Sequence, residues 1–520
     1  MIYGNKRQMA ALLLILIISC VASADVRLPS VIGDNMVLQQ GDSVPIWGWA
    51  EAGSKITVTG NWGTEKWETT AGQDGKWMVK IQPGKVGGPY EMTISDGNAI
   101  TVKNILVGEV WVCSGQSNME WPVGQSVKAA AEMADANNYP QIRLFTVGKK
   151  VSYEPMKNCK GNWQVCNSQS VKGFSAVGYF FGRQLNKELN IPIGLINTSW
   201  GGTPAESWMS KDALNANPDF VPILKRFGET VANYPELQKK YQMEKQKYEK
   251  EAADLRREGK PIPPRPEIYE PIGLNHPYSP TGLYNGMILP IVPYGIRGAI
   301  WYQGESNAWR AYQYRTLLPA MIKNWRQTWN QGDFPFLLVQ LANWKAVEPE
   351  PKENDWAELR EAQLMTLSVP NTGMAVTTDI GDANNIHPTN KQDVGKRLAL
   401  WALAKTYKKD VVYSGPLYKY MEIEGNKAIL HFDHVGGGLV AKGGEPLKGF
   451  AIASQDKKFV WGDAKIEGDT VVVSSDKVAE PAAVRYAWAI NPICNLYNKE
   501  ELPASPFRTD DWPGLTDKNR

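Results

Sequence analysis

Between residues 104 and 410, short apolar runs alternate with longer stretches whose apolar residues recur every three to four positions. The apolar runs predict buried strands and span residues 105–114, 192–199, 298–303, 334–341 and 374–380. The stretches with helical spacing span residues 177–189, 318–329 and 394–405. This alternation predicts an α/β domain with a mostly parallel sheet and helices on both faces.

The two flanks have a different pattern. Residues 25–103 contain closely spaced apolar runs separated by Gly, Asp and Asn turns, which predicts a sandwich-like β domain. Residues 411–520 return to this pattern, either as a second sandwich-like region or as the completion of the first. A helical insertion at about 215–275 interrupts the α/β part. Its charged residues 234–258 predict a solvated surface helix, with a lid or partner-binding arm as the alternative.

The first 24 residues read as a signal peptide. Lys6 and Arg7 precede an apolar run at residues 10–19, which is too short to span a bilayer. Cleavage after Ala24 gives a mature start at Asp25, whereas the residues before Cys20 resemble a bacterial lipobox and predict a lipid anchor there. We therefore expect a periplasmic or secreted protein, with an outer-membrane lipoprotein as the alternative. No later segment is apolar enough to span a membrane.

Composition narrows the range of partners and cofactors. The formal net charge of +3 is too small to attract nucleic acid. Four cysteines follow Cys20, too few for a disulfide scaffold, but Cys159 and Cys166 are close enough to form one small loop. No CxxC or His-rich spacing indicates a metal site. We expect neither a metal nor an organic cofactor.

Polar clusters follow four of the predicted strands. The first is a turn at residues 115–118 that carries Ser117, and the last includes His387, one of four histidines. A serine there is more often a helix N-cap. The carboxyl ends of parallel strands, however, meet at the edge of the sheet where ligands bind. His387 is the one histidine that follows a strand in this α/β part. The placement favours Ser117 as a nucleophile and His387 as its base.

Five motif blocks carry a resemblance to a known family. The sequences GQSNMEW, NTSWGGTPAESW, GLYNGMILP, IWYQGESNA and IHPTNK occur in order along the α/β part. They resemble the bacterial sialate O-acetylesterases, a family of the SGNH hydrolase group that is similar to carbohydrate esterases acting on xylan. The resemblance covers residues 104–408 and implies a three-layer α/β/α fold, flanked here by β-sandwich-like regions.

The resemblance also implies roles for matching residues. Ser117 attacks the acetyl carbonyl, and His387 accepts its proton and later passes it to the departing sugar hydroxyl. The oxyanion is expected to bind the Ser117 backbone N–H, a backbone N–H of Gly201 or Gly202, and the side chain of Gln303.

The acid of the triad departs from the family pattern. The group usually has Asp three residues before the histidine, but this chain has Asn384. Related sugar esterases use the glutamate of the QGES block as the acid, so the resemblance favours Glu305. Asp379 and Asp382 are the alternatives, and a dyad supported by backbone carbonyls is also open.

Four residues near these blocks are expected to contact the sugar: Gln116, Asn118, Trp200 and Arg310. Trp200 can pack against a sugar ring, and Arg310 can bind a sugar carboxylate. The alternatives are packing beneath the loops for Trp200 and an ion pair for Arg310.

The leading hypothesis is therefore an esterase that removes O-acetyl groups from sialic acid, with acetylated carbohydrate as its partner. An acetylxylan or other polysaccharide acetylesterase is the nearest rival. A glycosidase using Glu305 and Asp379 gives Ser117 and His387 no role. A non-catalytic carbohydrate-binding protein is the remaining class. The sequence does not specify the acetylated hydroxyl or the oligomeric state.

Overall fold

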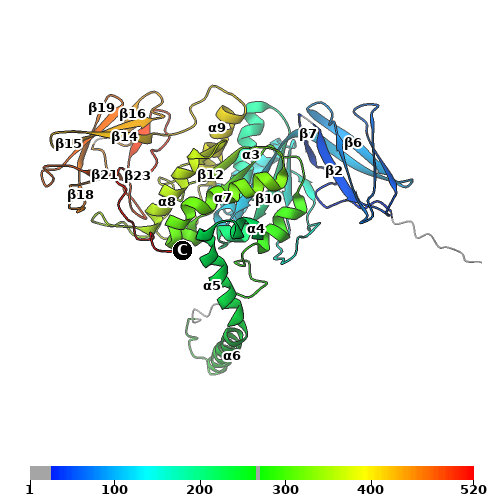
Figure 1. Cartoon of the computed structure of the whole chain (residues 1–520), viewed down its shortest axis with the longest axis horizontal. Helices are drawn as coiled ribbons and strands as arrows, with labels where there is room; N and C mark the ends of the chain where they lie inside the picture. The colour runs from blue at the N-terminus through cyan, green and yellow to red at the C-terminus, as the bar shows by residue number, and fades with distance from the viewer. Residues whose placement is uncertain (1–24, 42, 265–269, 445) are drawn as a thin grey trace, which may run out of the picture.

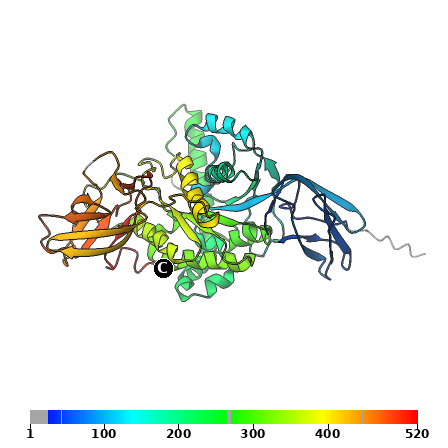
Figure 2. The same cartoon turned by 90° about the horizontal axis from the view of Figure 1, so that it is seen from above.

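The structure is a computed structural model that describes residues 25–520 except 42, 265–269 and 445. A helix-covered α/β region lies at the centre, and β regions lie at its two ends (Figures 1 and 2). The expected signal peptide and lipid-anchor site at Cys20 lie outside the described residues. None of the described helices is both long enough and apolar enough to cross a membrane.

Seven strands form the central sheet, in the order β13-β12-β11-β7-β10-β8-β9. They are β7 (Ala99–Gly115), β8 (Ile142–Thr146), β9 (Trp163–Val165), β10 (Ile193–Ser199), β11 (Gly298–Tyr302), β12 (Phe336–Val339) and β13 (Thr372–Ala375). All neighbours pair in parallel except β9, which runs antiparallel to β8. The predicted mostly parallel sheet is confirmed. The strand predicted over residues 374–380 extends too far, because β13 ends at Ala375 and residues 376–380 form a loop.

Helices cover both faces of this sheet. The longer ones are α3 (Ala176–Leu189), α7 (Ala311–Trp329), α8 (Asp355–Met365) and α9 (Lys391–Trp401). On one face, Trp111 of β7 packs against Phe181 of α3, and the helices α3 and α9 pack against each other. Trp301 of β11 pairs in register with Ser114 and packs against Trp325 of α7 on the opposite face. Because successive strand residues point to opposite faces, the two contacts define the outer layers of an α/β/α sandwich.

The N-terminal β strands form a small two-sheet region. They are β1 (Val37–Gln39), β2 (Val44–Trp49), β3 (Lys55–Gly60), β4 (Lys66–Thr70), β5 (Lys76–Ile81) and β6 (Gly87–Ser95). β2 pairs with β5, whereas β3, β4 and β6 join a ladder that continues into β7. β7 pairs with β6 through its first half and with β10 and β11 through its second half. The boundary expected at 103/104 therefore lies within a single continuous strand.

The C-terminal strands have their own core instead of completing the N-terminal sheets. They are β14 (Leu417–Glu424), β15 (Lys427–Asp433), β16 (Leu439–Ala441), β17 (Phe450–Ala453), β18 (Val460–Trp461), β19 (Asp463–Glu467), β20 (Thr470–Ser474), β21 (Ala483–Tyr486), β22 (Leu496–Asn498) and β23 (Phe507–Arg508). Two four-stranded sheets, β14-β15-β20-β19 and β18-β17-β21-β23, are accompanied by the pair β16-β22.

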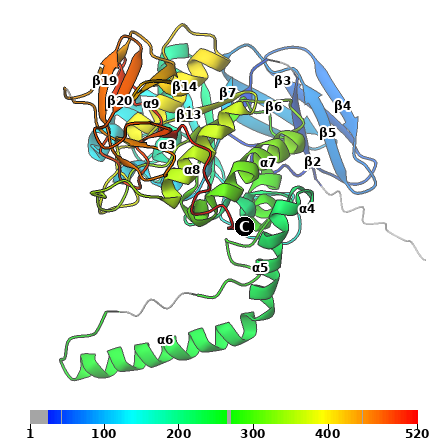
Figure 3. The same cartoon turned by 60° about the vertical axis from the view of Figure 1, so that its left-hand side comes forward.

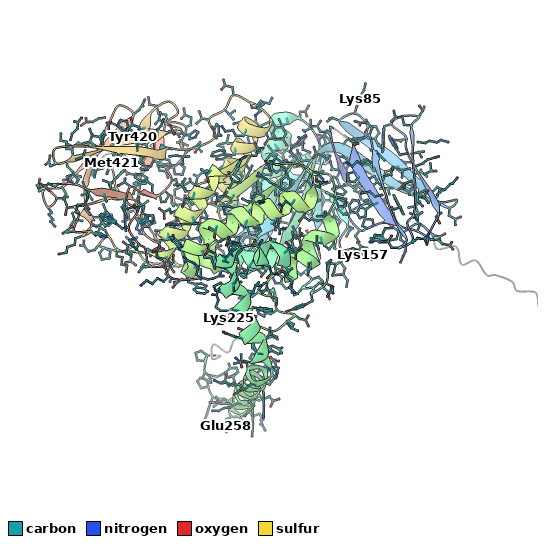
Figure 4. All side chains as sticks on the ribbon, in the orientation of Figure 1. Lys85, Lys157, Lys225, Glu258, Tyr420 and Met421 are labelled. Atoms are coloured by element: carbon teal, nitrogen blue, oxygen red, sulfur yellow. The ribbon has the colours of Figure 1, made fainter. Side chains whose placement is uncertain are left out.

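The charged insertion forms two helices, α5 (Val221–Ala232) and α6 (Tyr234–Arg257), after the short α4 (Lys211–Asn215). Figure 3 shows α5 leading away from the body of the molecule and α6 turning at its end, clear of the body, and Figure 4 labels Lys225 near the base of this arm and Glu258 at its far end. Ala252 is the one buried residue of α6. The helix itself is confirmed, and its exposure agrees with a solvated surface helix.

The cysteine pair does not form the disulfide that its spacing allows. Cys159 and Cys166 are both free thiols. Ser30 donates a hydrogen bond to the Cys159 carbonyl, whereas the Cys166 thiol points to the carbonyl of Ala136. The two residues are thus held by different neighbours. Cys113 is buried in β7, as expected, and its burial raises the pKa of the thiol.

Candidate active site

Ser117 lies at the carboxyl edge of the central sheet, where β7 turns into the short helix α1 (Ser117–Glu120). The turn depends on Gly115, whose φ is +137°. A Cβ atom at this position would lie 2.1 Å from the carbonyl oxygen of Tyr302 in β11. Only glycine therefore lets the two strands stay paired up to the residue before the turn. This geometry fixes where Ser117 leaves the sheet.

His387 reaches the same point from the loop between β13 and α9. Its Nε2 atom lies 2.8 Å from Ser117 Oγ, although the residues are 270 positions apart in the chain. The ring stacks on Trp121, with 5.2 Å between ring centroids and 20° between planes. Burial lowers the pKa of His387, and the nearby Lys391 lowers it further. The imidazole is therefore held neutral beside a hydroxyl, as a general base requires.

No carboxylate among the described residues accepts a hydrogen bond from His387. Asn384, at the usual acid position, is exposed, and its backbone N–H donates to Asp382. Arg397 binds Asp379 through two hydrogen bonds of 2.6 and 2.7 Å. Burial favours the neutral form of Asp379, but the ion pair outweighs it and lowers the pKa of the carboxyl. The geometry thus provides a Ser–His pair and no third acidic member.

Glu305, the favoured acid, contacts a different residue. Its Oε1 atom accepts a hydrogen bond of 2.6 Å from Asn118 Nδ2, and it makes none with His387. Burial raises the pKa of Glu305. No hydrogen bond joins Glu305 to His387 in the described part of the chain: Asn118 occupies Oε1, and Oε2 is buried without a hydrogen-bond partner. Asn118 is itself buried and is not placed to touch a sugar.

Two of the expected oxyanion donors are already engaged. Both amide protons of Gln303 are used, by the Thr203 carbonyl at 3.2 Å and by Asn307 Oδ1 at 2.6 Å. The Gly201 N–H donates to the carboxylate of Glu120 at 2.7 Å. These contacts occupy the Gln303 amide and the Gly201 N–H, and they leave Gly202 as the free donor of the expected Gly201–Gly202 segment.

The backbone N–H groups of Ser117 and Gly202 have no acceptor among the described residues. A Cβ atom built on Gly201 would lie 3.3 Å from Ser117 Cβ. The Gly201–Gly202 turn therefore runs directly beside the serine, and two backbone donors remain available there.

The expected sugar contacts divide into two groups. Arg310 is buried and pairs with Glu206 at 2.6 Å, so it is not placed to meet a sugar carboxylate. Gln116 is buried too, and its Oε1 atom accepts long contacts of 3.4 Å from the N–H groups of Gly304 and Ser306. Trp200 is half-buried, and Lys149 lies over its ring at 5.3 Å. Of the four, Trp200 keeps a position beside the serine from which a ring can stack on a ligand.

Sequence reasoning missed two charged residues at this site. Glu120 binds Gly201 and forms an ion pair of 2.5 Å with Lys149. Lys391 is fully buried and donates a hydrogen bond of 2.5 Å to Asn118 Oδ1. Glu120 and Lys391 lie inside the blocks GQSNMEW and IHPTNK, so the motifs contained the signal. The motifs do not predict, however, which way the side chains of Glu120 and Lys391 point.

Comparison with known proteins places this site in a family. A family model described as carbohydrate esterase, sialic acid-specific acetylesterase matches residues 107–251 and 278–404. The chain belongs to the sialic acid-specific acetylesterase family. It is 33% identical to the sialate O-acetylesterase of Rattus norvegicus, over 95% of this chain and 97% of that one. The human sialate O-acetylesterase is 31% identical, over 94% of each chain.

A solved structure agrees with both the family and the fold. A carbohydrate acetylesterase from Xanthomonas citri is 38% identical, covers 94% of this chain and 100% of its own, and has a TM-score of 0.79. The resemblance seen in the five motif blocks is thereby confirmed. The expected α/β/α fold is confirmed with it.

Proposed function

We propose that this member of the sialic acid-specific acetylesterase family is a serine esterase that hydrolyses O-acetyl esters of sugars, with Ser117 as nucleophile and His387 as general base. The 2.8 Å contact between Ser117 Oγ and His387 Nε2, at the sheet edge where such folds bind ligands, carries this proposal. The glycosidase alternative gives this contact no role.

The reaction follows from the positions of these groups. His387 Nε2 accepts the proton of Ser117 as Oγ attacks the acetyl carbonyl. The oxyanion of the tetrahedral intermediate binds the N–H groups of Ser117 and Gly202. Each such donor typically contributes about two to three powers of ten in rate. His387 then protonates the departing sugar hydroxyl, and water hydrolyses the acetyl-serine to release acetate.

Because no carboxylate among the described residues is hydrogen-bonded to His387, the proposed mechanism uses a Ser–His dyad. A buried carboxylate would stabilise the imidazolium and raise the pKa of the histidine. Here burial and Lys391 lower this pKa instead. The pair therefore relies on a histidine that is neutral at the start of the reaction, and on the backbone donors at the oxyanion.

The substrate that best fits the relatives is an O-acetylated sialic acid, because the rat and human proteins are named sialate O-acetylesterases. An acetylated polysaccharide is the competing substrate, because the related Xanthomonas citri protein is described more broadly as a carbohydrate acetylesterase. Acetate release from O-acetylated sialic acid and from acetylated xylan, measured with one enzyme preparation, separates the two.

Replacing the nucleophile tests the mechanism itself. S117A is expected to lose hydrolysis of both an aryl acetate and the sugar ester, while S168A, in the loop after β9, keeps it. Full aryl-acetate hydrolysis by S117A would overturn the serine mechanism. If the wild type binds the sugar but hydrolyses neither ester, the chain is a carbohydrate-binding protein.

Export through a signal peptide is part of the same proposal. The basic residues and apolar run before Ala24 support it. The intact mass of the mature protein distinguishes a chain that begins at Asp25 from one that begins at a lipid-modified Cys20. A mature protein that retains Met1 contradicts both forms.

A further inference from the structure

A buried polar network lies beneath the Ser117–His387 pair. Lys391, the first residue of α9, is fully buried and donates its 2.5 Å hydrogen bond to Asn118 Oδ1. The same amide donates through Nδ2 to Glu305 at 2.6 Å and to the Ile386 carbonyl at 3.1 Å. A buried lysine is rare, because removing its charge from water is costly. Its presence at this place therefore calls for a role.

The network joins the chain segments that carry the two reacting side chains. Asn118 directly follows Ser117, and Ile386 directly precedes His387. The Asn118–Ile386 hydrogen bond thus ties the helix of the serine to the loop of the histidine. Lys391 and Glu305 fix which way this amide faces, because one binds its oxygen and the other binds its nitrogen.

Lys391 also lies behind the imidazole itself. Its Nζ atom lies 5.9 Å from the centroid of the Trp121 ring, and that ring stacks on His387. Tyr302 of β11 packs on another side of the ammonium, at 5.3 Å. The ammonium therefore lies near Asn118, which follows Ser117, and near Trp121, which stacks on His387, and it is shielded from solvent.

We propose that Lys391 is a positioning residue for the esterase reaction: its ammonium orients Asn118 so that Ser117 and His387 stay in hydrogen-bond contact. This inference rests on the serine mechanism proposed above. It gives Glu305 the role of counter-charge to Lys391 in place of the acid of a triad.

The charges around Lys391 and His387 determine the direction in which removing Lys391 shifts the pKa of His387. Burial lowers the pKa of Lys391 to about 7, and Glu305 opposes this shift. Burial raises the pKa of the Tyr302 phenol, which therefore stays neutral. Lys391 is the charged group that lowers the pKa of His387. Below pH 7 Lys391 is protonated and positively charged. Its charge therefore opposes the protonation of His387 in the pH range in which His387 titrates.

The test compares K391M with K396M. Lys396 lies on the same helix but is exposed, so it is a matched control. K391M is expected to lower kcat for an aryl acetate by about a hundredfold, the effect of misplacing a catalytic group by roughly 1 Å. KM should change less than about twofold, because the buried ammonium does not touch substrate. The acid limb of its pH–rate profile should move to higher pH, and K396M should match the wild type.

E305Q provides a second variant in case K391M does not fold. The glutamine keeps an acceptor oxygen for Asn118 but removes the charge that favours protonated Lys391. Its kcat for the aryl acetate should fall, as in K391M, because a Lys391 that loses its charge more easily binds the Asn118 oxygen less strongly. An unchanged acid limb in folded K391M overturns the proposal, as does a K391M activity loss that only follows its unfolded fraction; an unchanged kcat in folded E305Q overturns it as well. Failure of the serine mechanism appears separately, as activity in S117A.

Discussion

Replacing Arg310 separates a structural role from a substrate-binding role. Arg310 and Glu206 form an ion pair of 2.6 Å, with side-chain exposures of 3% and 7%. Glu206 also accepts a hydrogen bond of 3.0 Å from Asn307, which in turn holds Gln303 and the backbone of Ala205. R310M would leave the Glu206 carboxylate buried without its cation.

The size of the effect follows from this burial. Removing one member of a buried ion pair typically costs about 3–5 kcal/mol, which is roughly two to four powers of ten in the unfolding equilibrium. The double variant E206Q/R310M removes both charges and should recover most of this loss. Urea unfolding followed by tryptophan fluorescence measures both variants, with K396M as a surface control.

The opposite result would support a sugar contact. If R310M unfolds at the wild-type urea concentration but has a raised KM for an acidic sugar ester and an unchanged KM for an aryl acetate, the ion-pair reasoning is refuted. Arg310 would then have to leave Glu206 to bind a carboxylate in the enzyme–substrate complex.

Two further predictions concern the dyad. Activity should fall on acidification as His387 takes up a proton. The midpoint should lie below the ordinary histidine pKa of about 6.5, because burial and Lys391 lower the pKa of His387. A pH–rate profile of kcat/KM with a midpoint above that value contradicts the role of His387 as the general base. G115A should reduce both stability and activity, since its Cβ would meet the Tyr302 carbonyl at 2.1 Å and its positive φ alone costs about 1–3 kcal/mol. Thermal unfolding and aryl-acetate hydrolysis check this variant, and wild-type values for both would refute the stated role of Gly115.

The sequence predicted the sheet and the meeting of Ser117 with His387 because both depend on strong, local signals. Buried parallel strands are continuous apolar runs, and the turns after them must meet at one edge. The strand β9 is only three residues long and has one buried residue, so its pattern carries little information. The helix α8 buries polar residues such as Arg360 and Gln363, which hides its buried face from a hydrophobic pattern.

The contacts of Gln303, Glu305 and Arg310 could not be predicted from the sequence, for a different reason. Gln303, Glu305 and Arg310 all lie in the segment that was expected to line the site. Each of these side chains has a partner from a distant part of the chain: Thr203 for Gln303, Asn118 for Glu305 and Glu206 for Arg310. A motif fixes the residue type and the loop, but the direction of a buried polar side chain depends on which partner satisfies it.

The unbroken course of β7 makes the N-terminal β region part of the catalytic framework. The boundary is not a free linker, because β7 pairs with neighbouring strands on both sides of it and has a bulge at Asn104, whose φ is +55°. Removing residues 25–103 would cut away the first five of the 17 residues of β7 (Ala99–Gly115), the strand that leads to Ser117 at the sheet edge. We therefore expect the two regions to unfold together at this junction, and we expect deletion of the β region to disturb the strand that positions Ser117.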